Sequence, residues 1–282
     1  MRGSLGFLML LPVNTLLAVV VPQDTSSSSD ALLTRLAIET AADGDLAPIV
    51  HPPGPNAQFA VYDLFRLVSL AARAALKGGH PLDPASPPRD LLAPRTVILA
   101  LARSPLGDDP GRPQAIEITA ADGRKIKRLG ALGPAEVAKT LPGVTVPPQT
   151  LVVVFDISSL RPSDRVTIVF NDPPGGADAR TIGAIRPGEF SGSVSFEAPK
   201  PIDTPQVRVP SGAGPASGNP AISVEGVLDL TGRVRYVRAL NGPVEWRNAV
   251  EAGVALWRYS PARMGGVPVP LVMQTTVRVH VR

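Results

Sequence analysis

The chain has 282 residues, which is enough for two globular units and their linkers, because domains commonly hold about 100 to 200 residues. A hydrophobic share of 44% against a charged share of 18% is typical of a folding protein, whereas 32 prolines and 26 glycines predict many breaks and linkers. The formal net charge is a modest +4, and the absence of cysteine excludes disulfide bonds, thiolate zinc sites and cysteine nucleophiles.

The chain begins with the pattern of a signal peptide. Arg2 supplies one positive charge, and residues 5–21 are mostly apolar. This run is at the short end for a membrane-crossing helix, which needs roughly 20 residues. We therefore predict a cleaved signal peptide at residues 1–23, with a membrane anchor as the alternative. Either would place the protein in the periplasm, secreted through or anchored in the inner membrane. A buried N-terminal helix of a cytoplasmic protein is the third interpretation.

Residues 24–93 are expected to form a helical and proline-rich segment. One helix is predicted at residues 31–42, behind polar residues that can cap it. A second is predicted between Pro55 and Gly78, where apolar residues recur at spacings of three and four. A pair of glycines ends this helix, and the prolines that follow predict a stiff connection.

Residues 94–198 show short apolar stretches separated by turn residues, a pattern typical of a β-sandwich. Asp122-Gly123 predicts a hairpin turn, and residues 133–139 predict one or two helical turns. Strands are expected at residues 96–102, 115–119, 124–129, 150–157, 165–170 and 192–197.

Residues 199–220 hold six prolines and three glycines and offer little to bury. This composition predicts an extended linker. We therefore place a domain boundary near residue 220 and expect the linker to share few contacts with either neighbour.

Residues 221–282 carry the clearest pattern. Residues 222–230 alternate largely between apolar and polar side chains, a Thr-Gly turn follows, and residues 234–239 predict a second strand. In residues 246–257 an apolar stripe recurs at helical spacing, which predicts an amphipathic helix. Residues 275–282 alternate again. The order predicts an α+β fold, with a small antiparallel sheet packed on one helix at the C-terminus, behind the β-sandwich and the N-terminal helices.

Three motifs in this segment together resemble the TonB C-terminal domain family in order and spacing. They are DLTGRV at residues 229–234, LWRYSPA at residues 256–262 and GGVPV at residues 265–269, followed by the alternating strand at the chain end. The resemblance does not extend to residues 30–200. The chain departs from the family in its leader, which has no ionisable residue in the apolar run, in its short linker, and in lacking the Tyr-Pro element before the first strand.

The resemblance implies a periplasmic domain that recognises an extended segment of an outer-membrane transporter by strand addition at the sheet edge near the C-terminus. Energy transducers of this family also couple to an inner-membrane motor complex. Partner binding is therefore expected at Thr276, Arg278, His280 and Arg282 on the last strand and at Arg258 and Tyr259 near the helix end. The rival hypothesis is an envelope scaffold protein that uses the fold for protein binding or homodimerisation, without energy transduction.

The charge distribution favours a protein partner over nucleic acid. Residues 221–282 hold eight Arg, no Lys and four acidic residues, so this segment accounts for the whole net charge of +4. A basic module suits an acidic partner surface or an anionic envelope. Nucleic-acid binding would usually require denser basic clusters with interleaved aromatic residues.

No catalytic constellation can be assembled from the sequence. His51, His80 and His280 lie in three different segments, and no pair has the spacing of metal ligands. Neither a phosphate-binding glycine-rich loop nor a nucleophile elbow occurs. We therefore predict that the protein is not an enzyme and that it carries no metal and no cofactor.

Overall fold

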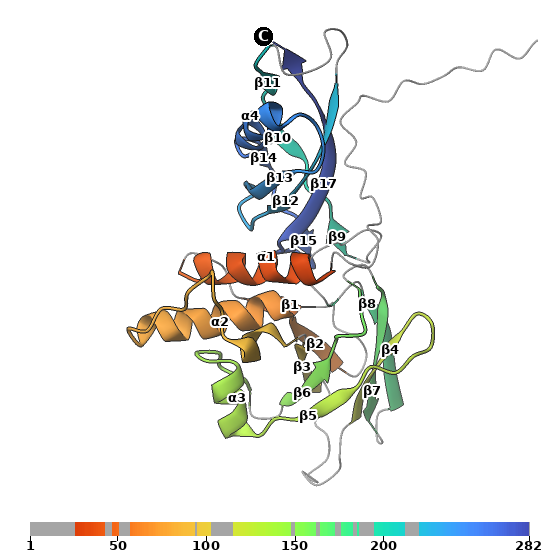
Figure 1. Ribbon diagram of the computed structural model, residues 1–282. Helices are drawn as coiled ribbons and strands as arrows, with labels where there is room; N and C mark the ends of the chain where they lie inside the picture. The colour runs from red at the N-terminus through yellow and green to blue at the C-terminus, as the bar shows by residue number, and fades with distance from the viewer. Residues whose placement is uncertain are drawn as a thin grey trace, which may run out of the picture.

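The computed structural model describes residues 26–42, 47–50, 57–93, 95–102, 115–147, 150–161, 164–172, 176–182, 185, 195–211 and 220–281. They form α-helices and mainly antiparallel sheets, which confirms the α+β class in general terms. Figure 1 shows helices α1 (Ser26–Glu39) and α2 (Leu64–Lys77) lying between the C-terminal sheet and the strands of the central part of the chain.

Helix α2 confirms the predicted second helix only over its C-terminal part. The Asp63 carboxylate caps it by accepting a hydrogen bond from the backbone N–H of Arg66, and Gly78 ends it. The prediction was wrong for residues 57–62, which form strand β2 (Ala57–Tyr62). The described side chains of β2 are buried or nearly so on both faces. The strand therefore lacks the alternation of a half-buried strand, and its apolar spacing fits a helix equally well.

The central part of the chain forms two antiparallel sheets around a shared core. The first has the order β1-β2-β3-β6-β5 and the second the order β4-β7-β8. Their bounds are β1 Ile49–Val50, β3 Arg95–Ala102, β4 Ala115–Ala120, β5 Arg128–Ala131, β6 Thr150–Asp156, β7 Val166–Asp172 and β8 Gly176–Ile182. Val153 and Phe155 of the first sheet belong to the same buried cluster as Ile116 and Ile168 of the second.

The predicted strands of this region agree with the structure at 96–102, 115–119, 150–157 and 165–170. The predicted strand at 124–129 is divided, because residues 124–126 pair back with β4 through the Asp122-Gly123 turn, whereas β5 begins at Arg128 and pairs with β6. Most of the strand expected at 192–197 lies outside the described residues. Helix α3 (Pro134–Thr140) confirms the predicted helical turns, and β8 was not predicted.

In the C-terminal segment two strands and a helix are followed by three two-residue strands and then by a long strand at Leu271–Arg278, which begins four residues before the predicted strand at 275–282. The sheet of this segment has the order β13-β12-β17, and helix α4 covers one face through Trp246, Val250 and Val254. Helices α1 and α2 pack against part of the other face, where Val227 and Val272 lie in the same cluster as α1 and α2 side chains. The bounds are β12 Ala221–Leu228, β13 Val234–Ala239, α4 Val244–Val254, β17 Leu271–Arg278 and β18 His280–Val281.

The expected linker is not free of contacts over residues 199–210. Its strands β10 (Pro201–Asp203) and β11 (Arg208–Val209) pair with β14 (Arg258–Tyr259) and β18. Just before it, β9 (Phe196–Glu197) pairs with β15 (Arg263–Met264), which also pairs with β16 (Val267–Pro268). The composition predicted an extended backbone correctly. It did not predict that this backbone would be docked on the C-terminal module.

Among the described residues, no helix combines the length and the apolar character needed to span a membrane. The predicted leader at residues 1–23 lies outside them.

Candidate strand-addition edge

Strand β17 lies at the edge of the C-terminal sheet. It pairs with β12 along its whole length, from Ala221 opposite Arg278 to Leu228 opposite Leu271. Within the part of the chain that the structure describes, no second strand pairs with β17 on its other side. An eight-residue edge without register shifts can accept an added strand.

The orientation of the β17 backbone follows from Ser223 on the neighbouring strand. Its N–H donates to the Asn241 side chain at 2.8 Å, and its carbonyl accepts from the Leu240 N–H at 2.8 Å. Both groups therefore point away from β17. Because Ser223 lies opposite Thr276, that pair exchanges no hydrogen bonds, and the N–H and C=O of Thr276 point outward. Because the direction of the backbone groups alternates along a strand, the N–H and C=O groups of Val272, Gln274 and Arg278 also point outward.

The opposite edge of the sheet, on β13, is closed to an added strand. Tyr236 has a φ of +51° and lies at a register shift between β12 and β13. The outward N–H of Ala239 is satisfied by the Glu251 carboxylate at 2.9 Å, and Arg233 already pairs with Arg258. Such bulges and side-chain caps are devices that protect a sheet edge. The outer edge of β17 is therefore the candidate docking site.

The predicted partner-binding side chains do not form one cluster. Thr276 and Arg278 are exposed at the C-terminal end of β17, and His280 follows on β18. Arg282 lies outside the described residues. Arg258 and Tyr259 lie at the other end of the sheet, beside the turn between β12 and β13.

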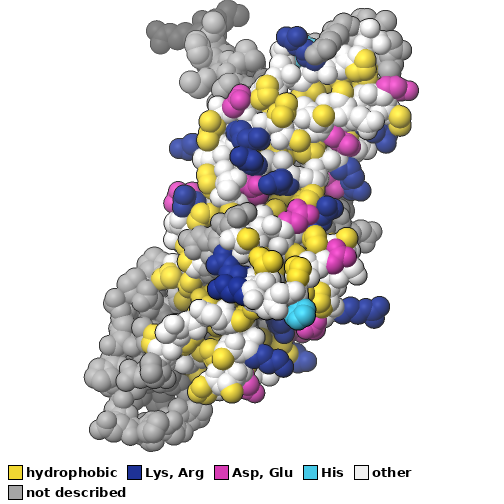
Figure 2. All heavy atoms as spheres, turned by 90° about the vertical axis from the view of Figure 1, so that its left-hand side faces the viewer, with side chains coloured by type: hydrophobic (Ala, Val, Ile, Leu, Met, Phe, Trp, Pro, Cys, Tyr) yellow, Lys and Arg dark blue, Asp and Glu magenta, His cyan; other side chains and the backbone are white. Residues whose placement is uncertain are grey.

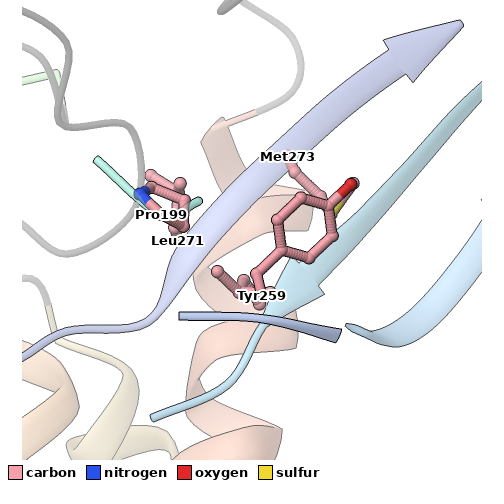
Figure 3. Close-up of a pocket in the computed structure, with 5 residues that line it drawn as sticks. Pro199, Tyr259, Leu271 and Met273 are labelled. Carbon is pink, nitrogen blue, oxygen red and sulfur yellow. The ribbon is translucent and has the colours of Figure 1, made fainter. Parts of the chain in front are cut away.

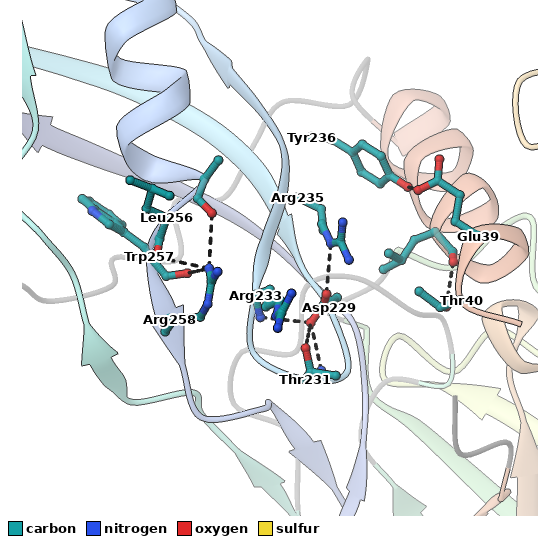
Figure 4. Close-up of polar contacts among 12 residues, drawn as sticks. Glu39, Thr40, Asp229, Thr231, Arg233, Arg235, Tyr236, Leu256, Trp257 and Arg258 are labelled. Atoms are coloured by element: carbon teal, nitrogen blue, oxygen red, sulfur yellow. Dashed lines mark hydrogen bonds and ion pairs between the residues drawn. The ribbon is translucent and has the colours of Figure 1, made fainter. Parts of the chain in front are cut away.

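Arg258 and Tyr259 have structural contacts within the chain. One guanidinium nitrogen of Arg258 donates to the carbonyls of Ala255, Leu256 and Trp257, at 3.3, 3.1 and 2.9 Å, at the end of α4 (Figure 4). Tyr259 is buried and its backbone N–H donates to the Gly232 carbonyl at 2.8 Å. These contacts within the chain explain why Arg and Tyr occur at positions 258 and 259, so a role in partner binding is not needed to explain them.

The turn between β12 and β13 is organised by the buried side chain of Asp229 (Figure 4). One carboxylate oxygen accepts from the Thr231 N–H and hydroxyl and from the Arg233 N–H, at 2.9, 2.7 and 2.9 Å. The other lies 3.2 Å from the Arg235 Nε. Burial raises the pKa of Asp229, but these hydrogen bonds outweigh it and hold the pKa below its ordinary value.

A small apolar niche lies at this end of the sheet (Figure 3). It has no room for a water molecule, so it reflects packing rather than ligand binding. Its lining residues are Pro199, Leu228, Tyr259, Leu271 and Met273.

The surface charges are mixed. Figure 2 shows basic and acidic side chains interspersed over one face of the molecule. On the exposed side of the sheet, Arg238 pairs with Glu225 at 2.6 Å, while Arg278 has its side chain exposed near the outer edge. Within the described residues no three His, Asp or Glu side chains gather in an arrangement that could hold a metal ion. His51 lies outside these residues.

Comparisons with protein-family models, with curated proteins and with solved structures found no match for this chain.

Proposed function

We propose that the chain is a TonB-like envelope protein of the periplasm that binds an extended segment of an outer-membrane transporter by strand addition to β17. The observation that carries the proposal is the asymmetry of the two sheet edges. The β13 edge is bulged and capped, whereas the β17 edge has an unbroken register with β12 and outward backbone groups at every second residue. The motifs shared with the TonB C-terminal domain support the same interpretation.

The backbone can supply only a moderate affinity. A net stabilisation of about 0.5 to 1.5 kcal/mol per hydrogen bond must offset the loss of freedom on association. Specificity must therefore come from side chains beside the edge. Arg278 favours an acidic residue in the partner segment, through an attraction that mainly accelerates association.

The second candidate function is a scaffold role, in which the module binds a partner without energy transduction from a motor complex. Two observations favour it. The C-terminal sheet packs on α1 through Val227 and Val272, and residues 199–210 are docked rather than free. A module held in this way suits a rigid docking platform better than a tethered domain.

The proposal is tested by titrating the full chain with peptides from the N-terminal segments of outer-membrane transporters encoded in the same genome. Thr276→Pro removes one outward N–H without removing a bond to β12, so it should weaken binding several-fold while the melting temperature changes little. Thr276→Val is the matched control, because it keeps the N–H and the side-chain shape and should bind normally. If Thr276→Pro binds as well as the wild type, the added strand does not lie on this edge.

A further inference from the structure

The segment from Pro205 to Pro210 occupies a groove between α4 and β18. Val207 and Val209 are buried, while Gln206 and Arg208, which alternate with them, are exposed. Strand β11 within this segment runs parallel to β18. The Val207 carbonyl accepts a hydrogen bond from the His280 N–H at 3.0 Å. His280 lies four residues after Thr276, so its backbone N–H points to the same side of the sheet edge as that of Thr276. The segment therefore lies along the outer edge that continues from β17.

The groove has room for Val207 because residue 253 of α4 is a glycine. A Cβ at Gly253 would lie 3.0 Å and 3.1 Å from the two γ-carbons of Val207. Glycine is unfavourable inside a helix relative to alanine. Its presence here is explained by the close approach of a branched apolar side chain from the segment.

Two tryptophans hold the ends of the segment. The indole N–H of Trp257 donates to the Pro205 carbonyl at 3.0 Å, and that of Trp246 donates to the Pro210 carbonyl at 3.2 Å. Trp246 lies in the first turn of α4, and Trp257 lies three residues beyond its last residue, Val254. The two indole donors therefore bracket the segment, one at each of its prolines.

We propose that this groove is a recognition site for extended segments of the type Pro-x-Val-x-Val-Pro, which residues 205–210 occupy in cis and which a partner segment of the same chemistry can occupy in their place. The groove supplies two indole donors, a glycine cradle and the edge of β18. The inference deepens the proposed function, because β18 extends the docking edge and a strand added along its full length must displace the segment in cis.

The probe is a labelled peptide with the sequence of residues 203–211, titrated into the full chain. Val207→Ser combined with Val209→Ser releases the segment in cis, and this variant should bind the probe at least ten times more tightly than the wild type. Adding Gly253→Leu should fill the groove and abolish binding. Adding Ala252→Leu, at an exposed neighbour on α4, is the matched control and should leave binding unchanged.

A released chain that melts cooperatively yet does not bind the probe, or that binds it despite Gly253→Leu, would overturn the proposal. If the released chain does not fold, Trp257→Phe provides the second measurement, because it removes one indole donor and keeps most of the packing. Hydrogen exchange at the His280 amide should then accelerate at least several-fold, and an unchanged rate would also overturn the proposal.

The transporter peptides are titrated into the same variants. If they bind while the 203–211 probe does not, the groove proposal alone fails. If the probe binds while they do not, the proposed function alone fails. Light scattering shows whether the wild type dimerises. A dimer in which residues 205–210 of each copy occupy the groove of the other would make a second copy the occupant, and this would overturn the proposal of a separate partner.

Discussion

Gly232 has no space for a side chain. A Cβ at this position would lie 1.8 Å from the Tyr259 carbonyl oxygen, and the residue has a φ of +83°. The motifs at residues 229–234 and 256–262 therefore meet in one close backbone contact. The backbone at Tyr259 therefore excludes any side chain at residue 232.

Gly232→Ala is expected to destabilise the protein by at least about 3 kcal/mol, because backbone strain of about 1 to 3 kcal/mol adds to the clash with Tyr259. Gly266→Ala is the matched control, since Gly266 has a similar φ of +79° but no neighbouring atom within 4 Å of the added Cβ. It should lose only about 1 to 2 kcal/mol. Chemical unfolding of both variants measures the difference, and equal losses would mean that the Tyr259 backbone moves aside freely.

Asp229 should make stability depend on pH in the acid range. Its pKa is lowered in the folded protein, so its contribution is fully present above the ordinary pKa of Asp and is lost as the pH falls through the folded value. Asp229→Asn should therefore cost about 1 to 3 kcal/mol at pH 7, and the gap to the wild type should narrow below about pH 4. The measurement is urea unfolding from pH 7 to pH 3. A gap that stays constant would show that the carboxylate charge contributes nothing.

At the scale of elements, local patterns located the first two C-terminal strands and the helix, but placed the start of the last strand four residues too late. Each of these elements has one buried and one exposed face, so its period is visible in the sequence. Helix α4 ends at Val254, earlier than the apolar stripe suggested. Trp257 lies beyond it, where its half-buried ring packs against the core and its indole N–H donates to the Pro205 carbonyl of the docked segment.

Elements buried on both faces, or too short to show a period, could not be predicted in this way. Strand β2 was assigned to a helix because its described side chains are buried or nearly so on both faces. The docked segment shows only Val207 and Val209 as a signal, and two alternating residues between prolines are also common in free linkers. The alternation at residues 275–282 predicted a strand there, and its place at the sheet edge was implied by the resemblance alone. The occupation of its continuation by β11 could not be predicted.

The whole molecule is joined by contacts between residues distant in sequence. The Tyr236 hydroxyl donates to the Glu39 carboxylate at 2.6 Å, and Arg35 lies over the Tyr236 ring, 4.8 Å from its centre. Burial and then the Glu39 hydrogen bond raise the pKa of Tyr236, so it stays a donor. The buried Arg66 guanidinium pairs with Asp63 at 3.0 Å and donates to the Pro268 carbonyl at 2.8 Å. No local pattern could have predicted the contact of Tyr236 with Glu39 or that of Arg66 with Pro268, whereas Asp63 and Arg66 are only three residues apart.

The docked segment should decide whether the C-terminal module folds as a fragment. A fragment of residues 195–282 keeps β9, β10 and β11, whereas residues 220–282 alone lack them. The shorter fragment loses two fully buried valines, each worth about 1.5 to 3 kcal/mol, and leaves both indole donors without their proline carbonyls. Small domains have only about 5 to 15 kcal/mol of total stability. The shorter fragment is therefore expected to melt without a cooperative transition.

Thermal melts of the two fragments, followed by circular dichroism, measure this difference. Both fragments expose Val227 and Val272, which α1 and α2 cover in the full chain, so that loss is the same for each and cancels in the comparison. The 195–282 fragment carrying Val207→Ser and Val209→Ser loses the apolar anchors of β11 but keeps β9 and β10. It should still melt cooperatively, at a lower temperature than the unsubstituted 195–282 fragment. If the 220–282 fragment melts as cooperatively and at the same temperature as the 195–282 fragment, residues 195–210 do not stabilise the module, and the boundary expected near residue 220 is the correct one.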